Sequence, residues 1–272
     1  MAEYHRERHT IDLVSFTGPI DRLRSQSEAF HSNYVSGSPY PHLAVENLFD
    51  PDDLDRLAAE FPKSEERDWL TWDHKNELKT TSRGIKKLPP FTQLFCLWLN
   101  SPEFIGEIER ITGIDNLVGD PTFYGAGLHE MFKGGWLSMH TDFTSHPSLS
   151  LTRCVNLLIY LNRDWDADWG GELELWDKNN QGKRVAYPPF FNQTMILPTN
   201  SETFYHGAPR RISCPDGYSR KLVSIYYWTP LFSTQSGGKP WVTWADDDKL
   251  EILKRMKRRA QWIWEAATKK MV

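Results

Sequence analysis

The sequence has few cysteines, and those it has are far apart. Cys96, Cys154 and Cys214 form no CxxC pair, and their number is odd. Such a scattered set indicates neither a disulfide framework nor a thiolate metal site. We therefore expect a reducing compartment, and we predict a cytoplasmic location.

Long apolar runs and a strong net charge are also lacking. Nowhere do about 18 consecutive apolar residues occur, as a transmembrane helix needs, and the charged start MAEYHRERHT does not resemble a signal peptide. A net charge of −4 gives no general attraction to nucleic acid or to an anionic membrane. We predict neither of these partners, and the sequence leaves the oligomeric state open.

The chain length suits one large domain, which we expect to span residues 1–272. Residues 1–41 are polar, and 32–41 are rich in Ser, Gly, Tyr and Pro, which predicts an extended, peripheral N-terminal arm. At the other end, apolar side chains recur at helical spacing within 246–270. We expect a C-terminal helix there.

Between these ends, the pattern changes from helical to β-rich. Within 42–120 we expect one strand followed by supporting helices, the first of them capped by Asp50 with Pro51 in its first turn. Within 121–230, short β-rich runs are separated by turn residues. This pattern predicts a mainly β fold with flanking helices, built on a double-sheet barrel or jelly roll. The expected core strands are 122–132, 136–143, 153–161, 171–176, 194–197 and 220–228.

The sharpest local feature is the run Met139-His140-Thr141-Asp142-Phe143. His140 and Asp142 lie two positions apart in a strand-like run, so their side chains leave the same face. His206, in Tyr-His-Gly, is the best candidate for a third ligand. Two imidazoles and one carboxylate on one face of an octahedral metal leave the other positions open, as in non-haem Fe(II) oxygenases.

Several motifs stand around this triad in a fixed order. Gly134-Gly-Trp precedes His140, and Arg153-Cys-Val-Asn-Leu-Leu-Ile-Tyr-Leu-Asn162 follows Asp142; Trp169-Gly-Gly-Glu-Leu173, His206-Gly and Arg220-Lys-Leu-Val-Ser224 come next. The ordered set resembles the Fe(II)/2-oxoglutarate-dependent dioxygenase superfamily, with the prolyl 4-hydroxylase-like branch the most similar. The resemblance covers about residues 120 to 230.

The resemblance implies a double-stranded β-helix (cupin-like) core that uses Fe(II), 2-oxoglutarate and O2, with ascorbate as a possible supporting reductant. It places Arg220 where a cation receives the distal carboxylate of 2-oxoglutarate, and Ser224 lies on the same strand face. Asn156 and Tyr160 share another strand face and are expected to line this cofactor site. By the same alternation, Arg153 should face away from them.

The expected activity is oxidation of an unactivated C–H bond of a small organic molecule, with succinate and CO2 as co-products. The candidates for substrate or cavity contact are His129, Trp136, Arg210 and Arg211. Trp69, Trp72 and Tyr124 are further candidates for the walls of a pocket.

Two other hypotheses stay open. The first is a prolyl or aminoacyl hydroxylase that acts on a protein. The second is a cupin-like metal or ligand binding protein without catalysis. A binder has no need of a carboxylate clamp such as Arg220 with Ser224. A zinc hydrolase is disfavoured, because the sequence has no HExxH-like arrangement.

Overall fold

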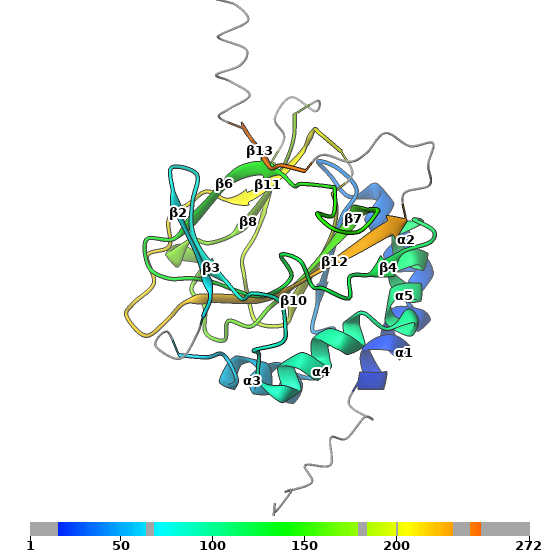
Figure 1. Cartoon of the computed structure of the whole chain (residues 1–272), viewed down its shortest axis with the longest axis horizontal. Helices are drawn as coiled ribbons and strands as arrows, with labels where there is room; N and C mark the ends of the chain where they lie inside the picture. Colours follow the sequence, from blue (N-terminus) through cyan, green and yellow to red (C-terminus); the bar gives the residue numbers. More distant parts are fainter. Residues whose placement is uncertain (1–15, 64–67, 179–183, 200, 231–239, 246–272) are drawn as a thin grey trace, which may run out of the picture.

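The computed structural model describes residues 16–63, 68–178, 184–199, 201–230 and 240–245. These residues form one antiparallel sheet with helices on one side of it (Figure 1). The strands are β1 Leu43–Glu46, β2 Leu70–His74, β3 Glu77–Thr81, β4 Val118–Gly119, β5 Gly127–Met131, β6 Trp136–Thr141, β7 Leu151–Tyr160, β8 Leu173–Asp177, β9 Arg184–Tyr187, β10 Gln193–Pro198, β11 Phe204–Ala208, β12 Arg220–Pro230 and β13 Thr243–Trp244.

The order of the strands in the sheet differs from their order along the chain. It runs β1-β10-β7-β12-β5-β3-β6-β11-β8-β9, with β2 added to β3, β4 to β12 and β13 to β6. Strands distant in sequence, such as β7 and β12 or β6 and β11, therefore lie side by side. This is the jelly-roll core with flanking helices that the pattern predicts.

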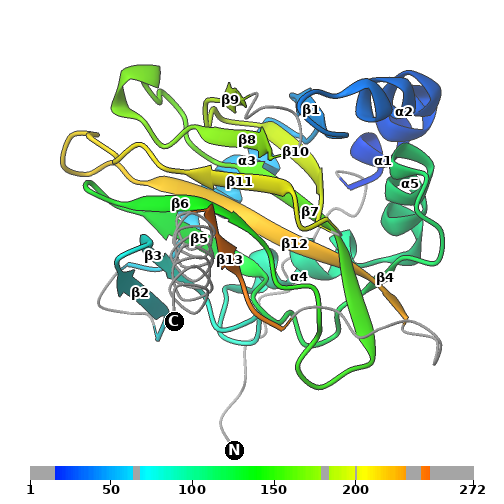
Figure 2. The ribbon, with the colours of Figure 1, turned by 90° about the horizontal axis from the view of Figure 1, so that it is seen from above.

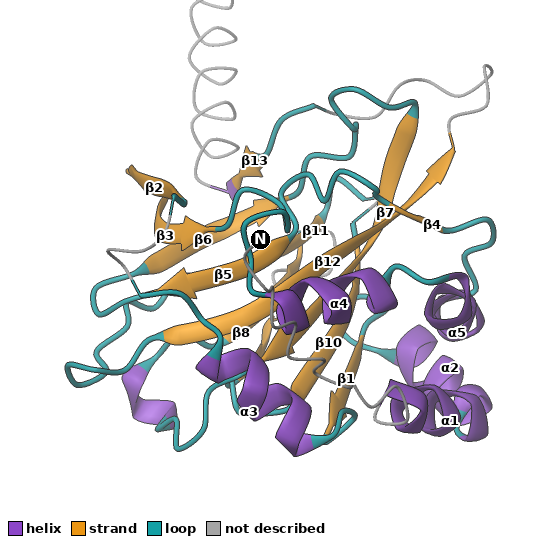
Figure 3. Cartoon of the chain, turned by 60° about the horizontal axis from the view of Figure 1, so that its bottom comes forward, coloured by secondary structure: helices purple, strands orange, loops and turns teal. Residues whose placement is uncertain are grey.

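The helices cover one face of the sheet, away from β2 and β13 (Figures 1 and 3). Along β7, Val155, Leu157 and Ile159 face the helices and join their apolar cluster, whereas Leu158 and Tyr160 belong to a second cluster inside the barrel. This alternation is the period of two that a strand imposes. The helices are α1 Thr17–Ser25, α2 Ser27–Ser36, α3 Pro51–Ala59, α4 Pro90–Leu99 and α5 Pro102–Thr112, with a 3-10 turn at Ala167–Trp169.

The strands and helices predicted for the middle of the chain are present, but β2, β3 and β4, which also lie within 42–120, were not predicted. Asp50 caps α3 by accepting a hydrogen bond from the backbone N–H of Asp52, with Pro51 in the first turn. Each of the six predicted core strands overlaps a strand of the structure. None of the described helices has the length and apolar character to cross a bilayer.

The prediction of an extended, peripheral arm at 1–41 is wrong for 17–36, where helices α1 and α2 form and pack into the core. Helix α2 runs to Ser36, and its Phe30 and Tyr34 are buried in the same apolar cluster as Leu23 of α1. Burial of these side chains outweighs the weak helix preference of this polar stretch. The helix predicted at 246–270 lies outside the described residues, and the one-domain assignment of 1–272 stays a prediction.

Candidate active site

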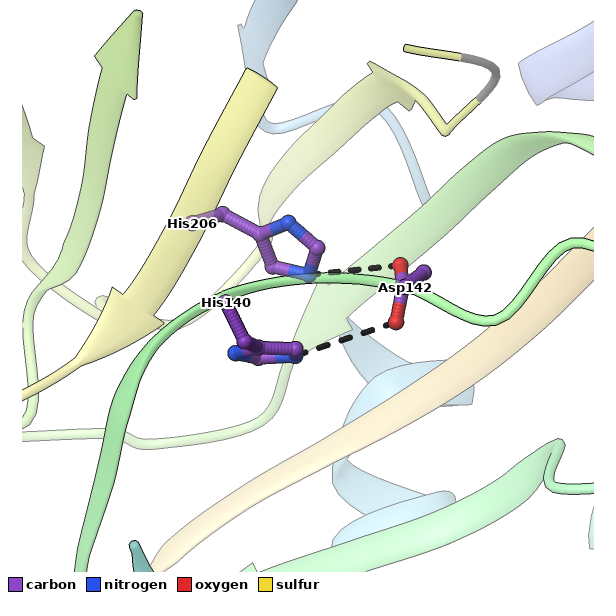
Figure 4. A group of neighbouring side chains, drawn as sticks. All are labelled: His140, Asp142 and His206. Atoms are coloured by element: carbon purple, nitrogen blue, oxygen red, sulfur yellow. Dashed lines mark ion pairs between the residues drawn. The ribbon is translucent and has the colours of Figure 1, made fainter. Parts of the chain in front are cut away.

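Strand pairing brings the two histidines of the predicted triad together. His140 of β6 and His206 of β11 are register partners, and their ring centroids are 4.5 Å apart. Asp142 follows β6 directly, and its carboxylate oxygens lie 3.7 Å from Nε2 of His140 and 3.4 Å from Nε2 of His206 (Figure 4). Within the described residues, these three side chains form the group of potential metal ligands, with ligand atoms within 4.8 Å of one another.

The glycine after His206 is required by the close approach of β6. A Cβ atom at Gly207 would lie 2.8 Å from the carbonyl oxygen of Leu137 and 2.9 Å from that of Ser138. The register between β11 and β6 also shifts between His206 and Ala208. The His-Gly pair therefore combines a ligand side chain with the one residue type that lets the two strands meet.

The protonation states suit metal binding. Burial, aided by the imidazole of His206, lowers the pKa of His140 to about 3, and burial lowers the pKa of His206 as well. The Nδ1–H of His140 donates to the carbonyl oxygen of Ser138 at 2.8 Å, which leaves its Nε2 lone pair free for a metal. Two neutral imidazoles and a carboxylate fit Fe(II).

Asp142 is held as an anion by a buried cation. Nη2 of Arg153 lies 2.5 Å from Oδ1 of Asp142, and Nδ2 of Asn156 donates to Oδ2 at 2.7 Å. Burial by itself would raise the pKa of Asp142, but the Arg153 guanidinium, the two imidazoles and Asn156 hold it well below its ordinary value. Each carboxylate oxygen keeps a lone pair for a metal.

The predicted orientation of Arg153 is wrong. Its side chain is fully buried, and its guanidinium lies 4.1 Å from the ring centroid of Phe143 and 4.2 Å from that of Tyr226. The register between β7 and β12 shifts so that Cys154 is an extra residue on β7. Such a bulge reverses the alternation beyond it, and Arg153 therefore reaches the same carboxylate as Asn156.

A small cavity of about 80 Å³ lies inside the barrel and reaches from the triad to Arg220. We call it the inner cavity. Nε of Arg220 donates to the carbonyl oxygen of Gly171 at 2.6 Å, and its Nη2 donates to the hydroxyl of Tyr160 at 3.0 Å. These two bonds hold the guanidinium plane and leave N–H groups of both terminal nitrogens for a ligand.

Two polar atoms at the inner cavity are buried without a partner in the described structure: Oγ of Ser224 and Oδ1 of Asn156. Unpaired buried polar atoms are costly, and a ligand commonly supplies the missing partner. A dicarboxylate with one end at Arg220 and Ser224 and the other at the triad would accept a hydrogen bond from the Ser224 hydroxyl, whereas Oδ1 of Asn156 is itself an acceptor and would need a donor such as water. The polar groups of the inner cavity thus suit a dicarboxylate such as 2-oxoglutarate.

A larger cavity of about 580 Å³ opens on the other side of the triad. We call it the outer cavity. It shares His129, His140, Asp142, Lys79 and Tyr226 with the inner cavity. Its walls come from the β2–β3 hairpin and from Trp244 of β13, which pairs with β6, the neighbour of β3 in the sheet (Figure 2). Aromatic side chains in these walls include Trp72, Phe123, Tyr124, Phe143 and Trp244.

The structure divides the predicted substrate contacts into two groups. His129 lines both cavities, and its Nε2–H donates to the carbonyl oxygen of Gly125 at 3.1 Å. Trp72 and Tyr124 line the outer cavity, whereas Trp69 does not. Lys79 and Glu77, which the sequence pattern did not single out, also line it.

The prediction that Trp136, Arg210 and Arg211 contact the substrate gains no support. They line neither cavity, and the Arg211 guanidinium lies 3.7 Å from the ring centroid of Trp136. Arg211 also donates to the carbonyl oxygen of Gly134, and Arg210 donates to those of Ala167 and Asp168. The two arginines therefore connect the loop after β11 to neighbouring loops by hydrogen bonds.

Residues 126–229 match the family model of the 2OG-Fe(II) oxygenase superfamily. Among solved structures, a prolyl-4-hydroxylase from Pseudomonas putida gives a TM-score of 0.52 at 13% identity over 75% of this chain and 100% of that chain. A structure of prolyl 4-hydroxylases from Phytophthora capsici gives a TM-score of 0.52 at 18% identity, over 78% of this chain and 66% of that chain.

A further solved structure is that of SnoN, described as a non-heme alpha ketoglutarate dependent epimerase from nogalamycin biosynthesis. It gives a TM-score of 0.50 at 12% identity over 80% of this chain and 93% of that chain. At these identities, the likenesses show the shared fold. No curated protein matches the sequence.

Proposed function

The chain belongs to the 2OG-Fe(II) oxygenase superfamily, and from that membership we propose that it oxidises an unactivated C–H bond of a small organic molecule. It is a 2-oxoglutarate-dependent oxygenase, with Fe(II) and 2-oxoglutarate as its cofactors. When bound with O2, these cofactors supply the oxidising chemistry, and 2-oxoglutarate is converted to succinate and CO2. The proposal concerns which residues hold them and which kind of substrate is oxidised.

The observation that carries the proposal is the position of the triad at the junction of two cavities. His140 and Asp142 line both cavities, and His206 lines the inner one. The inner cavity leads to the Arg220 fork, which suits a carboxylate gripped through two parallel hydrogen bonds. The metal ligands would therefore be His140, Asp142 and His206.

The remaining residues of the inner cavity would orient 2-oxoglutarate. Tyr160 and the carbonyl oxygen of Gly171 fix the guanidinium of Arg220, so that little side-chain freedom is lost when a carboxylate binds. The hydroxyl of Ser224 is available as a further donor. Leu158, Leu173 and Leu222 give the cavity apolar walls, which exclude water from the bound molecule.

The dimensions of the outer cavity favour a small-molecule substrate. Ligand pockets commonly measure roughly 300–1,000 Å³ and are lined mainly by apolar and aromatic groups with a few polar ones. The outer cavity, at about 580 Å³ with several aromatic walls, is of this kind. A compact molecule there would lie beside His140 and Asp142.

A peptide substrate is the second candidate, and the fold likeness to two prolyl 4-hydroxylases motivates it. The exposed side chains of Trp72 and Tyr124 lie on the wall of the outer cavity, where an extended chain could contact them. A non-catalytic cupin-like binder is not supported, because the match is to an oxygenase family.

The test is an anaerobic titration of Fe(II) and 2-oxoglutarate into the protein, followed by the visible metal-to-ligand charge-transfer band. We expect a band in the wild type, none in His140→Ala, and a band that needs far more 2-oxoglutarate in Arg220→Gln. Lys221→Gln is the matched control, because Lys221 is the next residue and extends toward Phe61 on the other face of β12. A folded, metal-loaded wild type without the band would overturn the assignment.

Substrate class can be examined in the same protein. Succinate formation would be measured in the presence of pools of small organic molecules and, separately, of proline-containing peptides. Stimulation by a small-molecule pool, with a product heavier by one oxygen atom, supports the proposal. Stimulation by peptides alone would instead support the second candidate.

A further inference from the structure

One wall of the outer cavity is a hairpin that lies outside the segment matched by the family model. Strands β2 and β3 pair so that Leu70 faces Thr81, Trp72 faces Lys79 and His74 faces Glu77. Side chains at alternate positions share one face. All of these except His74 line the outer cavity, so the hairpin presents a continuous surface to whatever the cavity binds.

The hairpin carries a charged pair whose negative member is already satisfied. One carboxylate oxygen of Glu77 lies 2.8 Å from Nζ of Lys79, and the other lies 2.9 Å from Nε2 of His74. The Glu77 side chain is only 7% exposed. Each carboxylate oxygen therefore already has a nitrogen partner on the hairpin, and the Lys79 ammonium compensates the negative charge.

Lys79, in contrast, has hydrogen-bond donors left for a ligand. Its ammonium carries three donors, and within the described residues its ion pair is with Glu77 alone. Its side chain is 17% exposed and borders both cavities. Donors are thus available at the point where the outer cavity meets the triad.

The other anionic group of the outer cavity is also compensated. Asp142 is held by Arg153 and Asn156 and faces the proposed metal position. Arg83, at the rim, is about half exposed and lies 3.3 Å from Asp68. The polar balance of the cavity therefore favours a ligand that brings hydrogen-bond acceptors and negative charge.

We propose that Lys79 determines substrate specificity by binding the carboxylate of an organic acid, whose apolar body lies against the aromatic walls of the outer cavity. The inference rests on the proposed function, because it takes the outer cavity as the substrate site. Trp72, the cross-strand partner of Lys79, lines the same cavity and supplies apolar surface for that body. The substrate class is then a compact, mainly apolar carboxylic acid.

The experiment compares carboxylates with matched neutral amides, for example phenylacetate with phenylacetamide and hexanoate with hexanamide. Binding is measured by calorimetry on the full chain without iron, and by the change each compound causes in the charge-transfer band of the anaerobic Fe(II) and 2-oxoglutarate complex. In the wild type, we expect the acids to bind about tenfold more tightly than the amides, as a charge-assisted hydrogen bond implies.

Substitutions of Lys79 and of Glu77 should change acid binding in opposite directions. Lys79→Met should remove the preference for acids, and Lys79→Arg should keep part of it. Glu77→Gln should strengthen acid binding, because it removes the carboxylate that competes for the Lys79 ammonium. A purely structural ion pair would instead be damaged in both Lys79→Met and Glu77→Gln, with acids and amides equally affected. Arg83→Met is the control for loss of one positive charge at the rim.

Each result has a definite meaning. Equal binding of acids and amides in the wild type overturns the proposal. So does a loss of 2-oxoglutarate affinity in Lys79→Met as large as that in Arg220→Gln, since Lys79 would then belong to the cofactor site. A wild type that gives no charge-transfer band but prefers acids in calorimetry, with the preference lost in Lys79→Met, would overturn the oxygenase assignment while supporting the anion site at Lys79.

Discussion

The inner and outer cavities meet at the same histidine and aspartate but are built from different parts of the chain. Apart from Lys79, every residue that lines the inner cavity belongs to the segment 126–229 matched by the oxygenase family. Much of the outer cavity comes from 70–84, 122–125 and 242–244, outside that segment. On the proposed function, the matched segment would hold the metal and 2-oxoglutarate, and the flanking segments would supply much of the substrate contact.

The largest effect is expected at Arg153, which lies behind both cavities. Replacing it by Met leaves Asp142 buried without its cation, and losing one partner of a buried pair typically costs about 3–5 kcal/mol. The free energy of unfolding of the metal-free protein, measured in urea, should fall by about that amount. Because a divalent metal also neutralises Asp142, adding Fe(II) anaerobically should restore more stability to Arg153→Met than to the wild type.

Arg163 offers a matched control for this variant. Its guanidinium binds both carboxylate oxygens of Asp55, at 2.5 and 2.7 Å, but both side chains are about half exposed. Exposed pairs contribute only about 0–1 kcal/mol. Equal losses in Arg153→Met and Arg163→Met would show that burial of the Arg153 pair has no energetic consequence.

The second prediction concerns the stability of the metal-free protein at acidic pH. Burial, with smaller charge effects, lowers the pKa of His129 and of His140 to about 3, and burial lowers the pKa of His206. In the unfolded chain these groups titrate near 6.5. The folded protein thus binds fewer protons than the unfolded chain between these values, so stability is full above about pH 6.5 and is lost as the pH falls toward 3.

Unfolding of the metal-free protein by urea at several pH values tests this sign. We expect the urea concentration at the unfolding midpoint to decrease as the pH is lowered from about 7 to about 5. His129→Gln should show a shallower fall, because one of the three neutral imidazoles is gone and this residue is not among the proposed ligands. A midpoint that rises with acid would contradict the assignment of neutral histidines at the junction of the cavities.

The sequence predicted the inner cavity far better than the outer one, for a physical reason. Strands buried on both faces are near-continuous apolar runs, as in β7 and β12, and His140 and Asp142 need only the two-residue period of a strand to share a face. Strand β3 carries Glu77, Lys79 and Thr81 on its cavity face instead. Polar inward side chains hide the pattern by which a strand is recognised.

Two other omissions have different causes. The bulge at Cys154, which turns Arg153 toward Asp142, depends on the register with β12 and leaves no local sign in the sequence. Helix α1, in contrast, could have been found. Phe16, Ile20 and Leu23 recur at helical spacing and are all buried.

The smallest predicted effect is that of Gly171→Ala, which should alter the inner cavity and leave the outer cavity unchanged. A Cβ atom at Gly171 would lie 3.0 Å from Cδ of Arg220, and the residue has a φ of +75°. Gly171→Ala should therefore displace the side chain of Arg220 and weaken its bond to the carbonyl oxygen of residue 171. We expect the affinity for 2-oxoglutarate, measured by the charge-transfer band, to fall about tenfold, as loss of a charge-assisted hydrogen bond implies.

Gly217→Ala is the control for this variant. Gly217 also has a positive φ, at +91°, but beyond its chain neighbours no atom lies within 4 Å of the position that a Cβ would take. It tests backbone strain without a collision. Binding of phenylacetate to Gly171→Ala should stay at the wild-type level, since Gly171 and Arg220 do not line the outer cavity. Parallel losses of phenylacetate and 2-oxoglutarate would mean that the two cavities act as one site, and that specificity is not set by the flanking segments alone.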